Sequence, residues 1–99
     1  MSESTVHVVA RITAKPDAVA ALQAVLVALL LPTRQEVGCH HYLLLQNREQ
    51  PADFTFIETW ADDAAIDQHL KSAHVQQALV QAAALLAVPP DIQRYDVIG

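Results

Sequence analysis

The sequence predicts an α+β domain in which strands and helical regions follow in the order strand, helix, strand, strand, helix, strand. Segments that alternate with a period of two and are rich in β-branched or aromatic residues are separated by segments of strong helix formers, and prolines stand near the helix ends. The chain has 99 residues, of which 53% are hydrophobic. This size and composition predict one folded domain over residues 1–99.

The first strand and the first helix are predicted in the N-terminal third of the chain. Residues 5–14 alternate between two sets of side chains and are rich in valine, which favours a strand. Pro16 and Asp17 follow, at positions that a first helical turn favours. The segment from Ala18 to Leu31 is then predicted to be helical. Pro32 is expected to end it, because proline cannot donate a helical hydrogen bond.

Two further strands are predicted at residues 38–47 and 53–61, joined by the turn-rich loop NREQPAD. Asp62 and Asp63 follow the second of these strands, and their charges favour a helix N-terminus at this point.

The second helical region is predicted from these aspartates to about Val88, and Ser72 marks a candidate break within it. Pro89 and Pro90 are expected to end it, before a last strand from Ile92 to Ile98.

This order of elements, βαββαβ, predicts a ferredoxin-like sandwich with two helices on one face of an antiparallel sheet. The predicted strands carry apolar residues on both faces, as Leu43 and Leu45 do against Leu44. An antiparallel sheet with one wet face would alternate more cleanly. The second face is therefore expected to pack against its copy in a homodimer.

Charge and composition exclude several classes of partner. The net charge is −5 and the six basic residues are scattered, so nucleic acid is not an expected partner. The longest apolar run, Ala24 to Leu31, is far short of the roughly 20 residues of a membrane span, so no membrane association is expected. The N-terminal segment lacks the pattern of a signal peptide, which predicts a cytoplasmic protein.

The sequence predicts neither a bound cofactor nor a bound metal. With only two glycines, Gly38 and Gly99, it cannot build a dinucleotide fingerprint or a phosphate-binding loop. His69 and His74 are five positions apart, which is roughly 140° of rotation on a continuous helix. They are therefore not expected to share a metal unless the helix breaks at Ser72.

Residues 54–74 place several chemically interesting side chains close together in the sequence. Glu58 either pairs with a cation such as Arg34 or Arg11, or lines a polar cavity. Trp60 is either an aromatic wall for a flat substrate or an ordinary core residue. His69 is the best candidate general base by residue type, and the alternative is a packed histidine with one hydrogen bond.

Three other residues are candidate substrate contacts. Phe56 is expected on the same strand face as Trp60 and would be a second aromatic wall. Tyr42 could offer its hydroxyl to a substrate oxygen, or bond to the backbone. Arg34 could hold an anionic group, or favour the end of the first helix.

Four segments of the chain resemble the antibiotic biosynthesis monooxygenase family, which includes quinol monooxygenases. They are VHVVARITAKPD (6–17), TRQEVGCHHYLLLQ (33–46), FTFIETW (54–60) and HLKSAHVQQAL (69–79). The last three contain the motifs E-x-G-C-x-x-Y, E-x-W and H-x-x-S-x-H, in that order. The resemblance implies a dimeric α+β barrel and a cofactor-independent oxygenase that uses dioxygen and an electron-rich aromatic or quinol substrate.

Such an enzyme must rely on a substrate that can itself give an electron to dioxygen, as a phenolate can. The protein then supplies a dry pocket, a base and a polar group near the developing anion. We therefore expect His69 as the base, acting with Trp60 and Glu58 as catalytic residues. Tyr42, Phe56 and Arg34 are the expected substrate contacts.

Two other functions are open. The fold can serve as a dimeric module that binds or sequesters a small hydrophobic ligand without turnover. Haem-degrading members of the family resemble this chain too, but Leu79 stands where they carry the histidine that ligates iron. Haem binding is therefore disfavoured.

Overall fold

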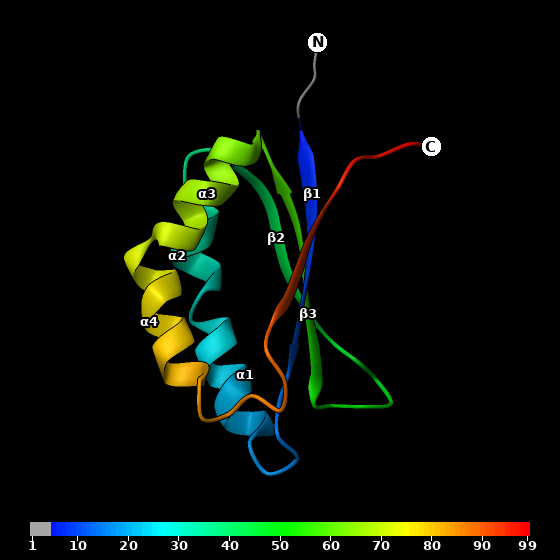
Figure 1. The fold of residues 1–99 in the computed structure, drawn as a ribbon, viewed down its shortest axis with the longest axis vertical. Helices are drawn as coiled ribbons and strands as arrows, with labels where there is room; N and C mark the ends of the chain where they lie inside the picture. The colour runs from blue at the N-terminus through cyan, green and yellow to red at the C-terminus, as the bar shows by residue number, and fades with distance from the viewer. Residues whose placement is uncertain (1–4) are drawn as a thin grey trace.

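The computed structural model describes residues 5–99 as one four-stranded sheet with helices on one face (Figure 1). The elements are β1 (Val6–Thr13), α1 (Val19–Val27), α2 (Leu30–Arg34), β2 (Cys39–Gln46), β3 (Asp53–Trp60), α3 (Asp63–Lys71), α4 (Ala73–Ala82) and β4 (Asp91–Tyr95). The strand order is β2-β3-β1-β4, and every neighbouring pair is antiparallel. This arrangement confirms the predicted ferredoxin-like α+β fold.

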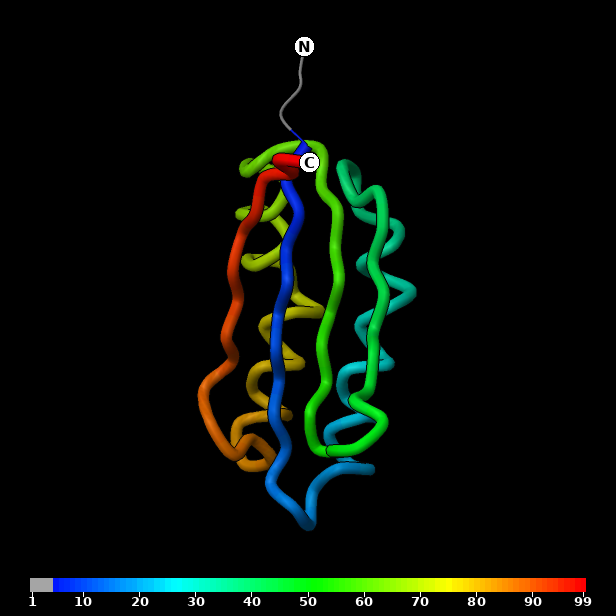
Figure 2. The backbone as a smooth tube through the Cα atoms, turned by 90° about the vertical axis from the view of Figure 1, so that its right-hand side faces the viewer, coloured from blue at the N-terminus to red at the C-terminus, as the bar shows by residue number. Residues whose placement is uncertain are grey.

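The core lies between the sheet and the helical layer. Burial alternates along β1 and β3, so one residue in two points toward the helices, as the period-two pattern predicts. Phe54, Trp60, Leu22 and Ile66 are at most 1% exposed and fill this layer from both sides. The tube view in Figure 2 shows the four strands side by side, with the helices behind them.

The first helical region differs from the prediction at Pro32. We expected one helix that ends there, but α1 ends at Val27 and α2 contains Pro32. Proline has no N–H to donate to the carbonyl of Ala28, four residues earlier, so the helix is interrupted before the proline rather than at it. Pro32 then sits in the first turn of a new short helix, where no donor is needed.

The second helical region breaks at Ser72, as the sequence indicated. Ser72 has an extended backbone (φ −64°, ψ 153°), ends α3 and caps α4, whose first turn donates to it through the backbone of Val75. The region ends at Ala82 and not near Val88. Residues 85–87 instead hydrogen-bond to the end of β1, which competes with helix continuation.

The last strand, Asp91–Tyr95, ends three residues before the predicted end at Ile98. Residue Tyr95 lies opposite His7 in the register of β1 and β4, and β1 begins one residue earlier. The expected extension to Ile98 has no such partner in the sheet formed by residues 5–99.

The sheet face opposite the helices carries exposed apolar side chains. Leu43, Leu45 and Tyr95 are each about half exposed there (51%, 48% and 50%). Since the helices cover the other face (Figure 1), no element among residues 5–99 covers this one. None of the helices in the described chain is both long and apolar enough to cross a membrane.

Candidate active site

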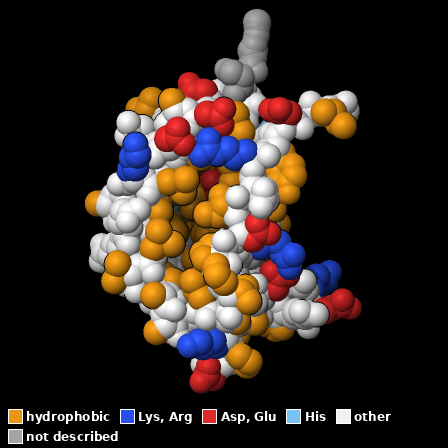
Figure 3. All heavy atoms as spheres, in the orientation of Figure 1, with side chains coloured by type: hydrophobic (Ala, Val, Ile, Leu, Met, Phe, Trp, Pro, Cys, Tyr) orange, Lys and Arg blue, Asp and Glu red, His pale blue; other side chains and the backbone are white. Residues whose placement is uncertain are grey.

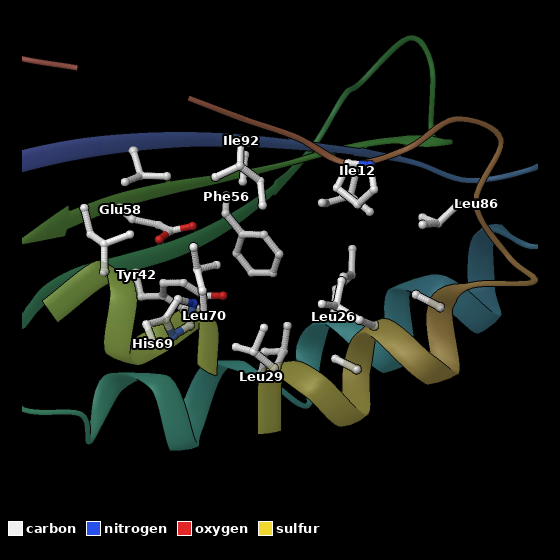
Figure 4. Close-up of a pocket in the computed structure, with 18 residues that line it drawn as sticks. Ile12, Leu26, Leu29, Tyr42, Phe56, Glu58, His69, Leu70, Leu86 and Ile92 are labelled. Atoms are coloured by element: carbon white, nitrogen blue, oxygen red, sulfur yellow. The ribbon is translucent and has the colours of Figure 1, made fainter. Parts of the chain in front are cut away.

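A cavity lies between the sheet and the helices, and its wall is almost entirely apolar (Figure 4). Tyr42, Glu58 and His69 gather at one end, while Ile12 and Leu86 lie at the other. The space-filling view in Figure 3 shows an apolar hollow between the helical layer and the sheet. An apolar cavity with a few polar groups at one end is typical of a small-molecule site.

Glu58 lies at the polar end of the cavity, and this residue is only 4% exposed. Its Oε1 accepts a hydrogen bond from Nε1 of Trp60 at 2.8 Å, because residues i and i+2 of a strand share one face. Burial raises the pKa of Glu58 to about 7, the bond from Trp60 opposes this rise, and the charge of Glu36 adds to it. Near neutral pH this carboxyl group can therefore either accept or donate a proton.

Of the two alternatives for Glu58, the ion pair with an arginine is wrong, and the structure instead places Glu58 in the lining of the cavity. Nε and Nη2 of Arg34 both donate to the backbone oxygen of Tyr42, at 3.0 and 2.8 Å, while Arg11 lies 3.4 Å from Asp53. Arg34 also does not line the cavity, so the structure does not support it as an anchor for substrate. These two hydrogen bonds hold α2 against β2, a role that a charge pattern alone does not reveal.

The aromatic residues divide into two groups. Phe56 and Tyr42 line the cavity and stack on each other with ring centroids 4.8 Å apart, as expected for walls of a pocket for flat molecules. Trp60 is fully buried and is not part of the cavity wall, so of its two predicted alternatives the structure favours the core residue over the aromatic wall. It lies behind the polar end, with its ring 4.7 Å from that of His69.

His69 lines the cavity and is held from the other side by Glu36, a residue that was not among the candidates predicted from the sequence. Nδ1 of His69 lies 2.7 Å from Oε2 of Glu36. A carboxylate only accepts, so Nδ1 carries the hydrogen and Nε2 is the nitrogen with a free lone pair. Nε2 has no hydrogen-bond partner among residues 5–99. These contacts also fit the alternative prediction for His69, a packed histidine with one hydrogen bond.

Burial favours the neutral form of His69. Burial lowers its pKa, and the hydrogen bond and charge of Glu36 oppose the shift. A neutral imidazole beside a carboxylate can take a proton on Nε2, after which Glu36 stabilises the imidazolium. The motif E-x-G-C-x-x-Y, in which Glu36 is the first residue, was the signal that could have identified it.

The break at Ser72 also brings His74 to the same carboxylate. Nε2 of His74 lies 2.8 Å from Oε2 of Glu36. The five-residue spacing separates the two histidines only on a continuous helix, and the extended backbone of Ser72 interrupts the helix between them. Within the described chain, Glu36, His69 and His74 have one ligand atom each within 4.8 Å of the others.

Ion pairs connect β4 to α3 at one edge of the site. Nη1 and Nη2 of Arg94 lie 2.8 Å from carboxylate oxygens of Asp63 and Asp67. Ile92 of the same strand lines the cavity, so these pairs fix the strand that forms part of the wall.

Comparisons with known proteins agree on the fold and on the family. Residues 5–81 match the family described as antibiotic biosynthesis monooxygenase. The chain is 36% identical over 86 residues to the protein named "Putative monooxygenase Rv0793" of Mycobacterium tuberculosis, covering 87% of this chain and 84% of that one. It is 30% identical over 70 residues to "Putative monooxygenase YcnE" of Bacillus subtilis, covering 71% and 74%.

Solved structures match over nearly the whole chain. The crystal structure of PA3566 from Pseudomonas aeruginosa superposes with a TM-score of 0.93 at 33% identity, covering 100% of this chain and 99% of that one. The structure of Rv0793 superposes with a TM-score of 0.90 and covers 97% of both chains.

Proposed function

The chain belongs to the antibiotic biosynthesis monooxygenase family, and on that premise we propose that it oxidises a small quinol or polycyclic phenol with dioxygen and without a bound cofactor. The observation that carries this proposal is the position of His69. Its Nδ1 is held by Glu36, and the ring lines an apolar cavity beside Tyr42 and Phe56. A base at the polar end of an aromatic-lined pocket suits the removal of a phenolic proton.

The proposed reaction begins with transfer of the phenolic proton to Nε2 of His69. The resulting phenolate gives one electron to dioxygen, and the phenoxyl radical and superoxide combine to form a carbon–peroxide bond at a ring carbon that carries hydrogen. Loss of that hydrogen and cleavage of the O–O bond leave a carbonyl on the substrate and release water. One oxygen atom is retained, the other leaves as water, and all four electrons come from the substrate.

The position of Glu58 in the cavity lining supports a role in the second half of this reaction, when the O–O bond is cleaved. Its carboxyl group lines the cavity, and with a pKa of about 7 it is partly protonated at neutral pH. A protonated Glu58 can donate to the peroxide oxygen that leaves as water. Trp60 holds the carboxyl group in place through Oε1, which makes it a positioning residue.

The same proposal includes a homodimer. The apolar outer face of the sheet, with Leu43, Leu45 and Tyr95 half exposed, supports burial against a second copy. A paired sheet would also close the domain on the side that the helices leave open.

An oxygen electrode tests the proposed function with a panel of naphthoquinols and anthrone-type phenols, without added cofactor. We expect dioxygen uptake faster than spontaneous oxidation in buffer, with a stoichiometry of one dioxygen per substrate. Rates equal to those in buffer, together with measurable ligand binding, would instead identify a module that sequesters its ligand.

A further inference from the structure

The convergence of Glu36, His69 and His74 has a second chemical meaning besides hydrogen bonding. Glu36 comes from the segment between α2 and β2, His69 from the last turn of α3, and His74 from the first turn of α4. Two imidazole nitrogens and one carboxylate oxygen form a common donor set for zinc and related divalent ions. We propose that these three side chains form a binding site for Zn²⁺ or a similar divalent transition ion.

The spacing of the donor atoms suits such an ion. Around a tetrahedral zinc with bonds of about 2.0–2.2 Å, neighbouring donor atoms lie roughly 3.4 Å apart. The shortest separation to Glu36 in the structure is 2.7 Å, and all three donor atoms lie within 4.8 Å of one another. Small side-chain movements that open the hydrogen bonds of both histidines to Glu36, and the 3.3 Å contact between Nε2 of His74 and the Ser72 hydroxyl, would admit the ion.

The surroundings of the three side chains favour a defined site over an incidental surface contact. The side chains of Glu36, His69 and His74 are 17%, 6% and 25% exposed. Glu36 and Ser72 also line a surface hollow, so the carboxylate of the set lies beside solvent. The Ser72 hydroxyl bonds to the backbone oxygen of His69 at 2.6 Å, which fixes the break that places both histidines.

Metal binding would change the tautomer of His69. In the structure Nδ1 carries the hydrogen and donates to Glu36. A neutral imidazole that binds a metal through Nδ1 must carry its hydrogen on Nε2. The nitrogen that serves as the base would then be blocked, so zinc would inhibit turnover; this consequence, unlike the metal site itself, rests on the proposed function.

Metal content after equilibrium dialysis tests the site directly. Tag-free protein, first treated with a chelator, is dialysed against zinc chloride or cobalt(II) chloride. We expect one ion per chain for the wild type. Glu36→Gln and His74→Ala should each weaken binding by more than the roughly 10- to 100-fold that loss of a second-shell partner costs. His40→Ala removes an exposed histidine on β2 and should leave binding unchanged.

Two outcomes would overturn the proposal. The first is a wild-type protein that binds no zinc. The second is zinc binding as strong as that of the wild type in both Glu36→Gln and His74→Ala, once circular dichroism has shown that the two variants are folded. If His74→Ala does not fold, His74→Asn replaces it.

The hydrogen position on His69 gives a second readout that needs no substrate. Nitrogen-15 NMR should show Nδ1–H without zinc and Nε2–H with zinc. An unchanged tautomer in zinc-loaded protein would contradict coordination by His69. Neither measurement depends on turnover. The proposed metal site can therefore be refuted while the proposed oxidation is supported, and the oxidation can be refuted while the metal site is supported.

Discussion

Glu36 accepts a hydrogen bond from Nδ1 of His69 at 2.7 Å, across 33 positions of sequence. The pair joins the segment before β2 to the end of α3, and it leaves the other nitrogen of His69 available at the cavity.

Replacement of His69 by alanine should lower the chemical step by roughly 10² to 10⁴, the usual contribution of a general base. Substrate affinity should change much less, because the aromatic walls remain. Single-turnover kinetics with the most active substrate of the panel separates the two effects. His41→Ala, at an exposed position of β2, is the matched control. Full turnover by a folded His69→Ala protein would exclude this residue as the base.

Glu36→Gln should lower the pKa of His69 further. The hydrogen bond and charge of Glu36 are the influences that oppose the lowering by burial, and the amide removes the charge. Since the base must be neutral, the acidic limb of the activity profile should move to lower pH while the maximal rate falls. Titration of the His69 ring by NMR measures the pKa without substrate. A pKa that rises or stays constant in the variant would contradict the assigned contact.

Glu58 should make the folded protein less stable as pH rises. Its pKa is raised from 4.5 to about 7, so between these values the folded state binds more protons than the unfolded state. Protonated Glu58 makes its full contribution to the free energy of unfolding below pH 4.5. This contribution, up to about 3 kcal/mol, is lost as the pH rises through 7. Glu58→Gln keeps an acceptor for Trp60 and should remove this loss.

Urea unfolding of the wild type and of Glu58→Gln between pH 4.5 and pH 8 measures this difference. The variant should gain stability relative to the wild type as pH rises, and the gain should level off above pH 7. The comparison between the two proteins cancels the contribution of His69, which has the opposite sign. Parallel curves over the whole range would show that Glu58 titrates normally.

The outer face of the sheet should mediate dimerisation. Sedimentation of the wild type should give a mass near twice 10.8 kDa, and the melting temperature should rise with protein concentration. Leu43→Glu places a charge on the proposed interface and should yield a monomer. Val80→Glu, at a 79% exposed site on α4, should not. A folded wild-type monomer at micromolar concentration would rule out the barrel.

Much of the fold could be predicted from the sequence because it depends on neighbours in the chain. The period-two pattern of residues 6–13 and 53–60 identified two central strands, and the break at Ser72 was indicated by a polar capping residue between helix formers. The end of the first helix was predicted wrongly at Pro32, because the hydrogen bond that proline cannot make is the one to the carbonyl four residues earlier. Whether a helix ends at the proline or restarts around it depends on the packing of Leu29 and Thr33, which the structure buries.

The candidate site could be predicted only in part. The sequence by itself determined the kinds of residue available: a carboxylate and a tryptophan at i and i+2 of one strand, and a histidine as a candidate base. Only the tertiary structure decided their partners. It joined Glu36 to His69, turned Arg34 to a backbone oxygen and placed Trp60 behind the cavity. These contacts join residues distant in sequence, and local periodicity carries no information about which distant side chains the packed elements bring together.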